Sequence, residues 1–298
     1  MSDHLWGIDL GGTKIEAAII DPVSFRSIER QRISTEANLG YRHILDQMSK
    51  LIRQLESSSR QKRPSKVGIG TPGICDPKSG RMLNANTICL IDEPLICDLE
   101  HLLDCKLVYE NDANCFALAE AVLGAGQGFD VVFGVILGTG VGGGIAIDGK
   151  VFGGKQGIAG EWGHNVLDPS GELCYCGKRG CVETVLSGPA IARRFNKQFG
   201  SNCSLPEIAS RAVAGDQSCS EFLTKVCEDF GRAMSVVVNI LDPSVIVLGG
   251  GVSNIDELYT VGAAALKRFT FHKNGFTPVK KAQLGDSAGV IGAALLTQ

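Results

Sequence analysis

The sequence predicts an α/β protein made of two similar halves, and three observations support this class. Strand-like and helix-like segments alternate along most of the 298 residues, which is the pattern of a sheet covered by helices. A β-hairpin pattern with a glycine turn occurs at residues 7–21 and returns at residues 134–148. The apolar segment 244–248 runs directly into three glycines, and α/β proteins hold nucleotides at the carboxyl ends of such strands.

The two hairpin patterns align without gaps at an offset of 127 residues. Their sequences are GIDLGGTKIEAAIID and GVILGTGVGGGIAID. Five of the fifteen positions are identical, namely Gly7 and Gly134, Leu10 and Leu137, Gly11 and Gly138, Ile20 and Ile147, and Asp21 and Asp148. A repeat of this length indicates a duplicated domain rather than a short-period solenoid. We therefore expect each half to open with a hairpin whose tip holds phosphate.

The composition is that of an ordinary globular protein and argues against several functional classes. A net charge of −3 gives no electrostatic basis for binding nucleic acid or an anionic membrane. No segment approaches the roughly 20 apolar residues of a membrane span, and residues 1–10 lack the charged and apolar regions of a signal peptide. The eleven cysteines favour a reducing compartment, since oxidation would threaten metal-binding thiolates. We therefore expect a cytoplasmic protein with no nucleic acid or membrane partner.

The other elements are expected in a simple order, without a low-complexity linker. Residues 26–35 form a strand, 41–57 an amphipathic helix, 66–73 a short strand with its loop, 106–126 a strand, a turn and a helix, and 131–150 the second hairpin. Helices follow at 189–199, 205–214 and 220–241, then a strand at 244–252, a helix at 255–269, a last strand at 278–285 and a closing helix at 287–296.

The turn of the first hairpin carries residue types that suit a phosphate. Gly11 and Gly12 leave backbone N–H groups open to an anion, and the Thr13 hydroxyl and the Lys14 ammonium group lie beside them. Asp9 interrupts the preceding strand near its end, where a buried strand would otherwise carry an aliphatic residue. A carboxylate in that place needs a partner such as a hydrated metal ion, so we expect Mg²⁺ there. By itself the GGTK pattern does not specify phosphate.

Asp112 is the best candidate for a general base. It follows a strand at an Asn-Asp turn and stands at the start of a helix, where the helix dipole keeps a carboxylate ionised as a proton acceptor. Plain N-capping by Asp112 or Asn114 is the alternative, because Asp and Asn are favoured cap residues. The local pattern leaves both interpretations open.

Three glycine-rich turns together indicate a nucleotide held for phosphoryl transfer. This chemistry needs charge neutralisation around the phosphates, an in-line approach and a base for the attacking hydroxyl. The backbone amides of the first turn and of Gly138, Thr139 and Gly140 can supply the neutralisation, with Gly249 and Gly250 as further nucleotide contacts. The sequence has no Walker pattern. We therefore expect ATP and Mg²⁺ to be bound in another way.

Residues 160–183 contain a specific metal-binding pattern. His164, Cys174, Cys176 and Cys181 give the spacing H-x9-C-x-C-x4-C within loop-like sequence. One imidazole and three thiolates form a closed tetrahedral zinc set, which is the composition of a structural site. The alternative is a chance grouping of three cysteines within eight residues of a cysteine-rich chain.

Several neutral or acidic hydrogen-bonding side chains indicate a sugar-type ligand. They are Asn84, Asn86, Asn111, Glu161, His164 and Glu183. Such groups suit the hydroxyls of a polyol, whereas a strongly anionic substrate would call for Arg or Lys. Lys178 and Arg179 are too few to argue for an anion. We expect the metal to shape a loop and the carboxylates beside it to use that shape.

Seven motifs, taken in order, resemble the ROK family of sugar kinases over essentially the whole chain. They are DLGGTK (9–14), ENDANCFALAEA (110–121), LGTGVGGG (137–144), GEWGH (160–164), CYCGKRGCVET (174–184), NILDPSVIVLGGGVSN (239–254) and GDSAGVIGAALL (285–296). Within the family, GEWGHN, CYCGK and LNAN (83–86) resemble the bacterial fructokinase/mannokinase branch more than the N-acetylhexosamine kinases. NDANCFALAEA is also similar to the latter.

The resemblance implies an actin-like ATPase fold with two RNase H-like domains, an active site in the cleft between them, and often a homodimer. It implies a smaller domain of residues 1–115 and 285–298 and a larger domain of residues 116–284 that carries the zinc loop. It also implies Asp112 as the base and, as sugar-holding residues, Asn86, Asn111, Glu161, His164 and Glu183. His164 would bind zinc through one ring nitrogen and approach the sugar with the other.

We therefore predict an ATP-dependent kinase that phosphorylates the 6-hydroxyl of a free hexose, namely fructose, mannose or glucose. A kinase for N-acetylglucosamine, N-acetylmannosamine or glucosamine is the alternative within the family. A non-catalytic sugar sensor is a more distant alternative, which the intact Asp112 and glycine turns disfavour. Repressors of the family carry an N-terminal helix-turn-helix domain, whereas this sequence starts at its first phosphate hairpin, so we expect an enzyme. Loops 73–95 and 150–160 are expected to set the sugar identity.

Overall fold

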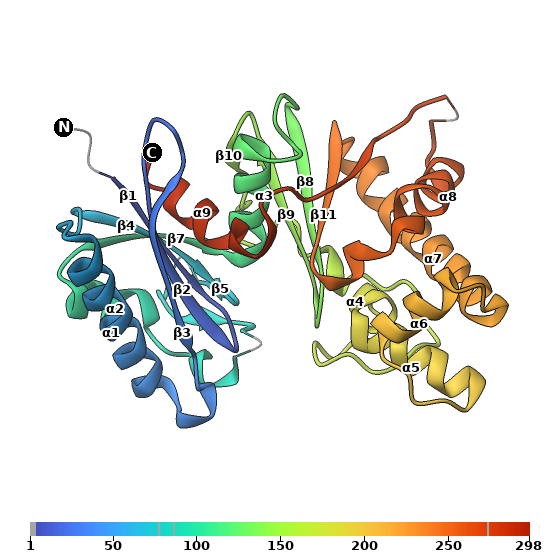
Figure 1. Cartoon of the computed structure of the whole chain (residues 1–298), viewed down its shortest axis with the longest axis horizontal. Helices are drawn as coiled ribbons and strands as arrows, with labels where there is room; N and C mark the ends of the chain where they lie inside the picture. Colours follow the sequence, from blue (N-terminus) through green and yellow to red (C-terminus); the bar gives the residue numbers. More distant parts are fainter. Residues whose placement is uncertain (1–3, 77, 86, 273) are drawn as a thin grey trace. The chain divides into compact units, whose positions relative to one another are not determined.

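The chain divides into two compact units, each with its own sheet and helices (Figure 1). A computed structural model describes residues 4–76, 78–85, 87–272 and 274–298. The first unit comprises Met1–Gly124, Gly149–Ala159 and Leu284–Gln298, and the second comprises Ala125–Asp148 and Gly160–Gln283. Residues 116–124 and 149–159 thus group with the first unit, whereas the predicted division assigns them to the larger domain.

A five-stranded sheet forms the centre of the first unit, in the order β3-β2-β1-β4-β7. Its strands are β1 (Leu5–Leu10), β2 (Lys14–Ile20), β3 (Ser27–Ser34), β4 (Lys66–Thr71) and β7 (Lys106–Asn111). The first three strands pair antiparallel, whereas β4 and β7 run parallel to β1. The short strands of this unit are β5 (Ile74–Cys75), β6 (Met82–Leu83) and β10 (Lys150–Val151). The hairpin predicted at the start of the chain is confirmed.

Helices cover both faces of this sheet. α1 (Tyr41–Ser59) and α2 (Leu95–Leu103) pack on one face, and α3 (Asp112–Leu123) and α9 (Ala288–Leu295) pack on the other (Figure 1). α2 is not among the predicted elements, because nine residues give only two turns of apolar periodicity.

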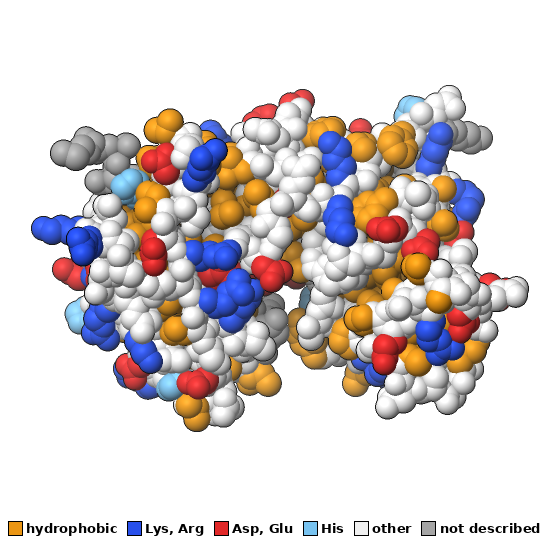
Figure 2. All heavy atoms as spheres, in the orientation of Figure 1, with side chains coloured by type: hydrophobic (Ala, Val, Ile, Leu, Met, Phe, Trp, Pro, Cys, Tyr) orange, Lys and Arg blue, Asp and Glu red, His pale blue; other side chains and the backbone are white. Residues whose placement is uncertain are grey.

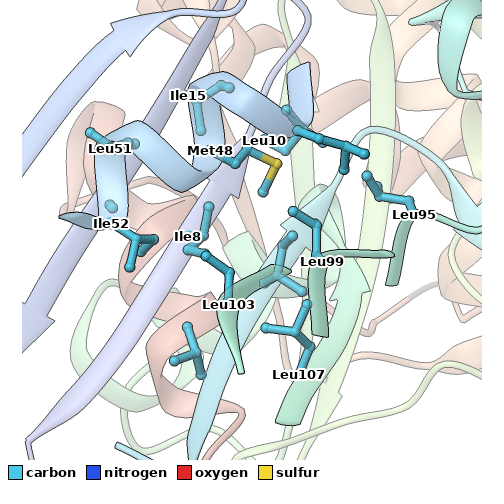
Figure 3. Packing of buried hydrophobic residues seen from close by; sticks show 14 of the residues in the cluster. Ile8, Leu10, Ile15, Met48, Leu51, Ile52, Leu95, Leu99, Leu103 and Leu107 are labelled. Atoms are coloured by element: carbon cyan, nitrogen blue, oxygen red, sulfur yellow. The ribbon is translucent and has the colours of Figure 1, made fainter. Parts of the chain in front are cut away.

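The two faces follow from the alternation of side chains along β1 and β2. Ile8 and Leu10 point into a large apolar core, where they lie with Met48 of α1 and Leu99 of α2 (Figure 3). Full burial of each such side chain stabilises the fold by about 1.5–3 kcal/mol. Asp9, between the two core residues, faces the opposite side, against α9.

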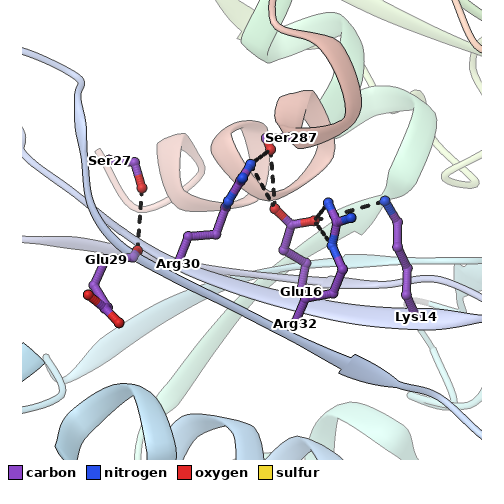
Figure 4. A network of polar contacts seen from close by, with 7 residues as sticks. All are labelled: Lys14, Glu16, Ser27, Glu29, Arg30, Arg32 and Ser287. Carbon is purple, nitrogen blue, oxygen red and sulfur yellow. Dashed lines mark hydrogen bonds and ion pairs between the residues drawn. The ribbon is translucent and has the colours of Figure 1, made fainter. Parts of the chain in front are cut away.

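A buried carboxylate network links the hairpin to β3 and to the start of α9 (Figure 4). Glu16 is fully buried and accepts hydrogen bonds from Nε and Nη2 of Arg32, at 2.9 and 2.6 Å. The Ser287 hydroxyl donates to it at 3.2 Å. Lys14 and Arg30 lie 4.0 and 3.6 Å from its oxygens. Three cations thus surround one carboxylate beside the first glycine turn.

The second unit repeats the strand arrangement of the first. Its strands lie in the order β9-β8-β11-β12. They are β8 (Val131–Leu137), β9 (Val141–Ile147), β11 (Val245–Gly249) and β12 (Val279–Lys281). β8 and β9 form an antiparallel hairpin, and β11 and β12 run parallel to β8. Because β2, β1, β4 and β7 show the same pattern, the predicted similarity of the two halves is confirmed.

The helices of the second unit follow residues 160–181, which contain the four predicted zinc ligands. They are α4 (Val182–Leu186), α5 (Gly188–Phe199), α6 (Leu205–Val213), α7 (Gln217–Leu241) and α8 (Val261–Phe269). The helix predicted over 255–269 is wrong in its first part, where Asp256–Tyr259 forms a 3₁₀ turn. The Tyr259 hydroxyl donates to the Ser253 carbonyl at 2.7 Å, which ties this turn to the preceding loop.

Charged side chains of both signs are interspersed on the face drawn in Figure 2, in keeping with the net charge of −3. Across the part of the chain that the structure describes, no helix has the length and apolar character required to span a membrane.

Candidate active site

The carboxyl ends of β1, β4 and β7 meet at one edge of the first sheet. Asp9 of β1 pairs with Gly70 of β4, and Gly70 pairs with Glu110 of β7. Neighbouring strands lie about 4.8 Å apart, so the backbones of Asp9 and Glu110 are about 10 Å apart. Asp112 follows Glu110 by two residues. The structure therefore brings the predicted cation ligand and the predicted base to the same edge.

Asp9 lies in an acidic environment. Burial raises the pKa of Asp9 to about 7, and the carboxylates of Asp112 and Glu16 add to the shift. Lys14 and Arg32 offset part of it. An ionised Asp9 is repelled by two neighbouring carboxylates, and a bound cation would relieve that repulsion. The donor chemistry of this edge therefore suits Mg²⁺.

Asp112 opens α3 but does not cap it. The N-cap is Asn111, whose Oδ1 accepts the N–H of Asn114 at 2.8 Å. The Oδ1 of Asp112 accepts the N–H of Ala113 at 2.8 Å. Capping by Asp112 or Asn114 is therefore wrong, because the residue before the predicted base is the cap. Asn111, predicted to hold sugar, has its side-chain oxygen committed to this bond.

Glu110 is not among the predicted site residues. It is half-buried, and burial raises its pKa, although hydrogen bonds from the Asn111 N–H and the Asn114 side chain lower it in part. A Cβ atom on Gly153 would come within 3.0 Å of its Oε2, so the loop 150–160 lies against this carboxylate. An acidic residue directly before Asn-Asp at a strand end is the signal that could have identified it.

The first glycine turn is closed by its own backbone. The N–H of Gly11 donates to the carbonyl of Lys14 at 2.9 Å, so this group is not open to an anion as expected. A Cβ atom on Gly12 would lie 3.3 Å from Oγ1 of Thr87. Thr87, which no sequence pattern singles out, therefore lies at the turn beside Gly12.

Two other asparagines of the first unit belong to the predicted sugar-binding set. Asn84 follows β6 and has φ +52°, a left-handed conformation that asparagine tolerates better than most residues. Asn86 lies outside the described residues. The sugar contacts of both stay predictions.

In the second unit, two glycine segments come together. Gly138 donates its N–H to the Gly140 carbonyl at 2.9 Å, and Gly188 donates to the Gly138 carbonyl at 2.8 Å. Gly250 has φ +81°, and a Cβ atom there would lie 2.4 Å from the Leu137 carbonyl oxygen, so only glycine fits. The structure thus places close together five predicted nucleotide-binding residues: Gly138, Thr139, Gly140, Gly249 and Gly250.

The four predicted zinc ligands converge. Their ligand atoms all lie within 4.8 Å of one another. Sγ of Cys174 is 3.6 Å from Nδ1 of His164, and Sγ of Cys176 is 3.5 Å from Sγ of Cys181. A tetrahedral zinc ion gives about 3.8 Å between sulfurs and about 3.6 Å from sulfur to nitrogen, whereas a disulfide would need about 2 Å. The residues therefore fit zinc.

The segment 160–164 is anchored to the body of the second unit. Nε1 of Trp162 donates to the Ala233 carbonyl of α7 at 3.1 Å. A Cβ atom on Gly163 would lie 2.1 Å from the Val141 carbonyl oxygen, so glycine is required where the segment packs on β9. This anchoring fixes the backbone that leads into His164.

The two ring nitrogens of His164 face different groups. Nδ1 faces the thiol cluster, and Nε2 lies 2.9 Å from the hydroxyl of Tyr175. The two rings meet edge to face, with centroids 5.0 Å apart. Tyr175 is not among the predicted site residues, yet it lies at the nitrogen predicted to approach the sugar.

Glu183 links two predicted functions within the second unit. Burial raises the pKa of Glu161, and the nearby Glu183 carboxylate adds to the shift. Oε2 of Glu183 accepts the N–H of Val141 at 3.0 Å, and Val141 directly follows the second glycine turn. The structure therefore joins a predicted sugar-binding carboxylate to a predicted phosphate-binding turn.

Asp9→Asn is expected to stabilise the protein at pH 8 in the absence of Mg²⁺. The pKa of Asp9 is raised from 3.8 to about 7 on folding, so its ionisation opposes folding. This cost grows as pH rises from 4 to 7 and is complete above pH 7. Removing it should add about 2–4 kcal/mol at pH 8 and little at pH 4. Urea unfolding at both pH values measures this.

Asp46→Asn, an exposed site on α1, is the matched control and should change stability little at either pH. An Asp9→Asn protein that is no more stable than wild type at pH 8 would contradict the acidic environment of Asp9.

Comparison with known proteins places the chain in a family. The sequence matches the ROK family over residues 5–298. The N-acetyl-D-glucosamine kinase of Mannheimia succiniciproducens is 37% identical over 306 residues, which cover 98% of each chain. The ROK hexokinase from Thermus thermophilus is similar in structure, with a TM-score of 0.87 and 32% identity over 98% of this chain and 97% of that one.

A second solved structure agrees. The ROK family glucokinase from Streptomyces griseus, in complex with glucose and AMPPNP, has a TM-score of 0.82 and 32% identity over 98% of both chains. These similarities confirm the predicted actin-like ATPase fold. With the match over nearly its whole length, the chain belongs to the ROK family.

Proposed function

We propose that this protein transfers the γ-phosphoryl group of ATP to the 6-hydroxyl of an N-acetylhexosamine, with N-acetylglucosamine as the first candidate. As a member of the ROK family, the chain is an ATP-dependent sugar kinase. The N-acetylated sugar is supported by the 37% identity with an N-acetyl-D-glucosamine kinase over almost the full length of both chains. This identity favours an N-acetylhexosamine, the alternative given in the sequence analysis, over a free hexose.

A free hexose is the second candidate. Two proteins with 32% identity and closely similar structures are a ROK hexokinase and a ROK glucokinase. The motifs that resemble the fructokinase/mannokinase branch point in the same direction. Glucose and mannose therefore belong in any test of specificity.

The geometric observation that carries the kinase proposal is the position of Glu183. Its carboxylate lies near that of Glu161 and also accepts the N–H of Val141 at the second glycine turn. A kinase has to hold a hydroxyl-bearing acceptor near the phosphate groups of its donor. A carboxylate that can bind sugar hydroxyls and is hydrogen-bonded to a phosphate-binding turn meets this requirement.

In the proposed reaction, Asp112 accepts the proton of the 6-hydroxyl while the hydroxyl oxygen attacks the γ-phosphorus and the bond to ADP breaks. Backbone N–H groups of the glycine turns donate to the phosphate oxygens. Mg²⁺ held near Asp9 would neutralise phosphate charge. Zinc held by His164 and the three cysteines would fix the sugar-binding loop, since four protein ligands leave no open position. A homodimer, implied by the family resemblance, stays a prediction.

The sugar preference is tested by kinase assays with a panel of acceptors. Turnover of N-acetylglucosamine, N-acetylmannosamine, glucosamine, glucose, mannose and fructose is followed by coupled detection of ADP. We expect the highest kcat/KM for N-acetylglucosamine, at least about tenfold above glucose, which corresponds to roughly 1.4 kcal/mol of discrimination. A higher value for glucose, mannose or fructose would establish the second candidate. Absence of ADP release with every sugar would favour a sugar sensor.

Asp112→Asn is expected to lower kcat by at least about 10²-fold, because the amide cannot accept the proton and general-base catalysis contributes 10²–10⁴-fold. Sugar affinity, measured by calorimetry, should stay near that of wild type. Asp46→Asn on α1 should leave both quantities unchanged. Turnover near the wild-type rate in Asp112→Asn would refute its role as the base.

Cys176→Ala is expected to remove zinc and to weaken sugar binding more than ATP binding. The loss of one of four ligands should reduce the metal content below about half an equivalent, since metal binding and loop folding are coupled. Metal analysis and separate titrations with sugar and ATP measure the two effects. Cys97→Ala, an exposed cysteine outside the cluster, is the control. An equal loss of both affinities would mean that the metal serves only the fold.

A further inference from the structure

With zinc bound at Nδ1, His164 would have one ring N–H group left to donate, at Nε2. When Nδ1 binds zinc through its lone pair, the proton of the neutral imidazole resides on Nε2. That N–H donates to the hydroxyl oxygen of Tyr175, at 2.9 Å. Metal-bound histidines commonly hold such a partner on the second nitrogen. A sugar hydroxyl that contacts His164 at Nε2 must therefore compete with Tyr175.

Tyr175 lies beside one proposed sugar-binding residue, His164, and between two proposed zinc ligands. Its chain neighbours Cys174 and Cys176 are both zinc ligands, so the metal loop fixes its backbone on either side. Its hydroxyl group lies 2.9 Å from Nε2 of His164, one of the side chains predicted to hold sugar.

The tyrosine side chain is also free to move away. It is 66% exposed; its hydroxyl is hydrogen-bonded to His164, and its ring meets the His164 ring edge to face. An exposed side chain held in this way is readily displaced by a ligand that replaces the hydrogen bond.

We propose that Tyr175 is a further residue of the sugar site, and that its hydroxyl and a hydroxyl of the sugar alternate as the acceptor at Nε2 of His164. The inference rests on the proposed function, since it takes His164 to be a sugar-binding residue. A sugar that places a hydroxyl at Nε2 replaces the lost bond, whereas one without a hydroxyl there does not. Tyr175 thereby lowers the affinity for every sugar that displaces it, by the free energy of its bond to His164.

Tyr175→Phe tests the competition, because it keeps the ring and removes the competing oxygen. The Kd for the sugar is expected to fall by about 2–10-fold, the equivalent of one net hydrogen bond. The Kd for ATP and the zinc content should not change. Tyr41→Phe is the matched control, since the Tyr41 hydroxyl donates to Asp98 at 2.7 Å within the first unit, and its sugar affinity should equal that of wild type.

The direction of the change in the sugar Kd distinguishes competition by Tyr175 from direct binding of the sugar and from no role in the site. A higher Kd in Tyr175→Phe would show that the hydroxyl binds the sugar directly, and an unchanged Kd would place Tyr175 outside the site; either result overturns the competition. In wild type labelled with ¹⁵N-histidine, added sugar should shift the Nε2–H resonance of His164, because its acceptor changes.

The titrations use whichever sugar of the panel binds wild type best. If that sugar is not an N-acetylhexosamine, the proposed function fails, while the comparison of Tyr175→Phe with wild type is still decided. If no sugar binds, both proposals fail. A Tyr175→Phe protein with intact zinc and wild-type ATP affinity excludes misfolding as the cause of any change.

Discussion

The register of the first hairpin is the constraint that brings Asp9 to the same sheet edge as Asp112. Pairing of β1 with β2 sets Asp9 opposite Glu16, and alternation along each strand turns both carboxylates away from the large core. Parallel pairing with β4 and β7 then brings Asp112 to the same edge. A slip of one residue would reverse every side chain of β1 and place Asp9 in the apolar core.

The electrostatics of this edge have a cost in stability that suits a nucleotide site. Asp9 carries a pKa of about 7 because it is buried near two other carboxylates, and three cations lie around one of these, Glu16. A phosphate with its metal ion would satisfy both features at once, since the metal offsets the carboxylates and the phosphate offsets the cations. A carboxylate whose pKa is shifted by burial and by neighbouring charges is typical of functional sites.

In the second unit, the main structural requirement is the ordering of a long loop. Residues 160–181 contain little regular structure, and such a segment would be mobile without cross-links. Trp162 anchors one end of the loop to α7, and the convergent ligands would anchor the rest through zinc. Glu183, at the start of α4, then connects the loop to the second glycine turn. The groups predicted to bind sugar and phosphate are thereby parts of one hydrogen-bonded structure.

The sequence by itself determined the features that depend on short-range spacing. Both hairpins, most helices and the convergence of His164 with three cysteines follow from periodicity, glycine positions and residue spacing, because these patterns lie within short segments of the sequence. The tertiary structure decided the partnerships between distant residues, such as Val141 with Glu183 and Gly12 with Thr87. It also decided that Asn111 caps α3 and that Tyr175 occupies Nε2 of His164. These contacts depend on backbone direction and side-chain packing, which local patterns do not encode.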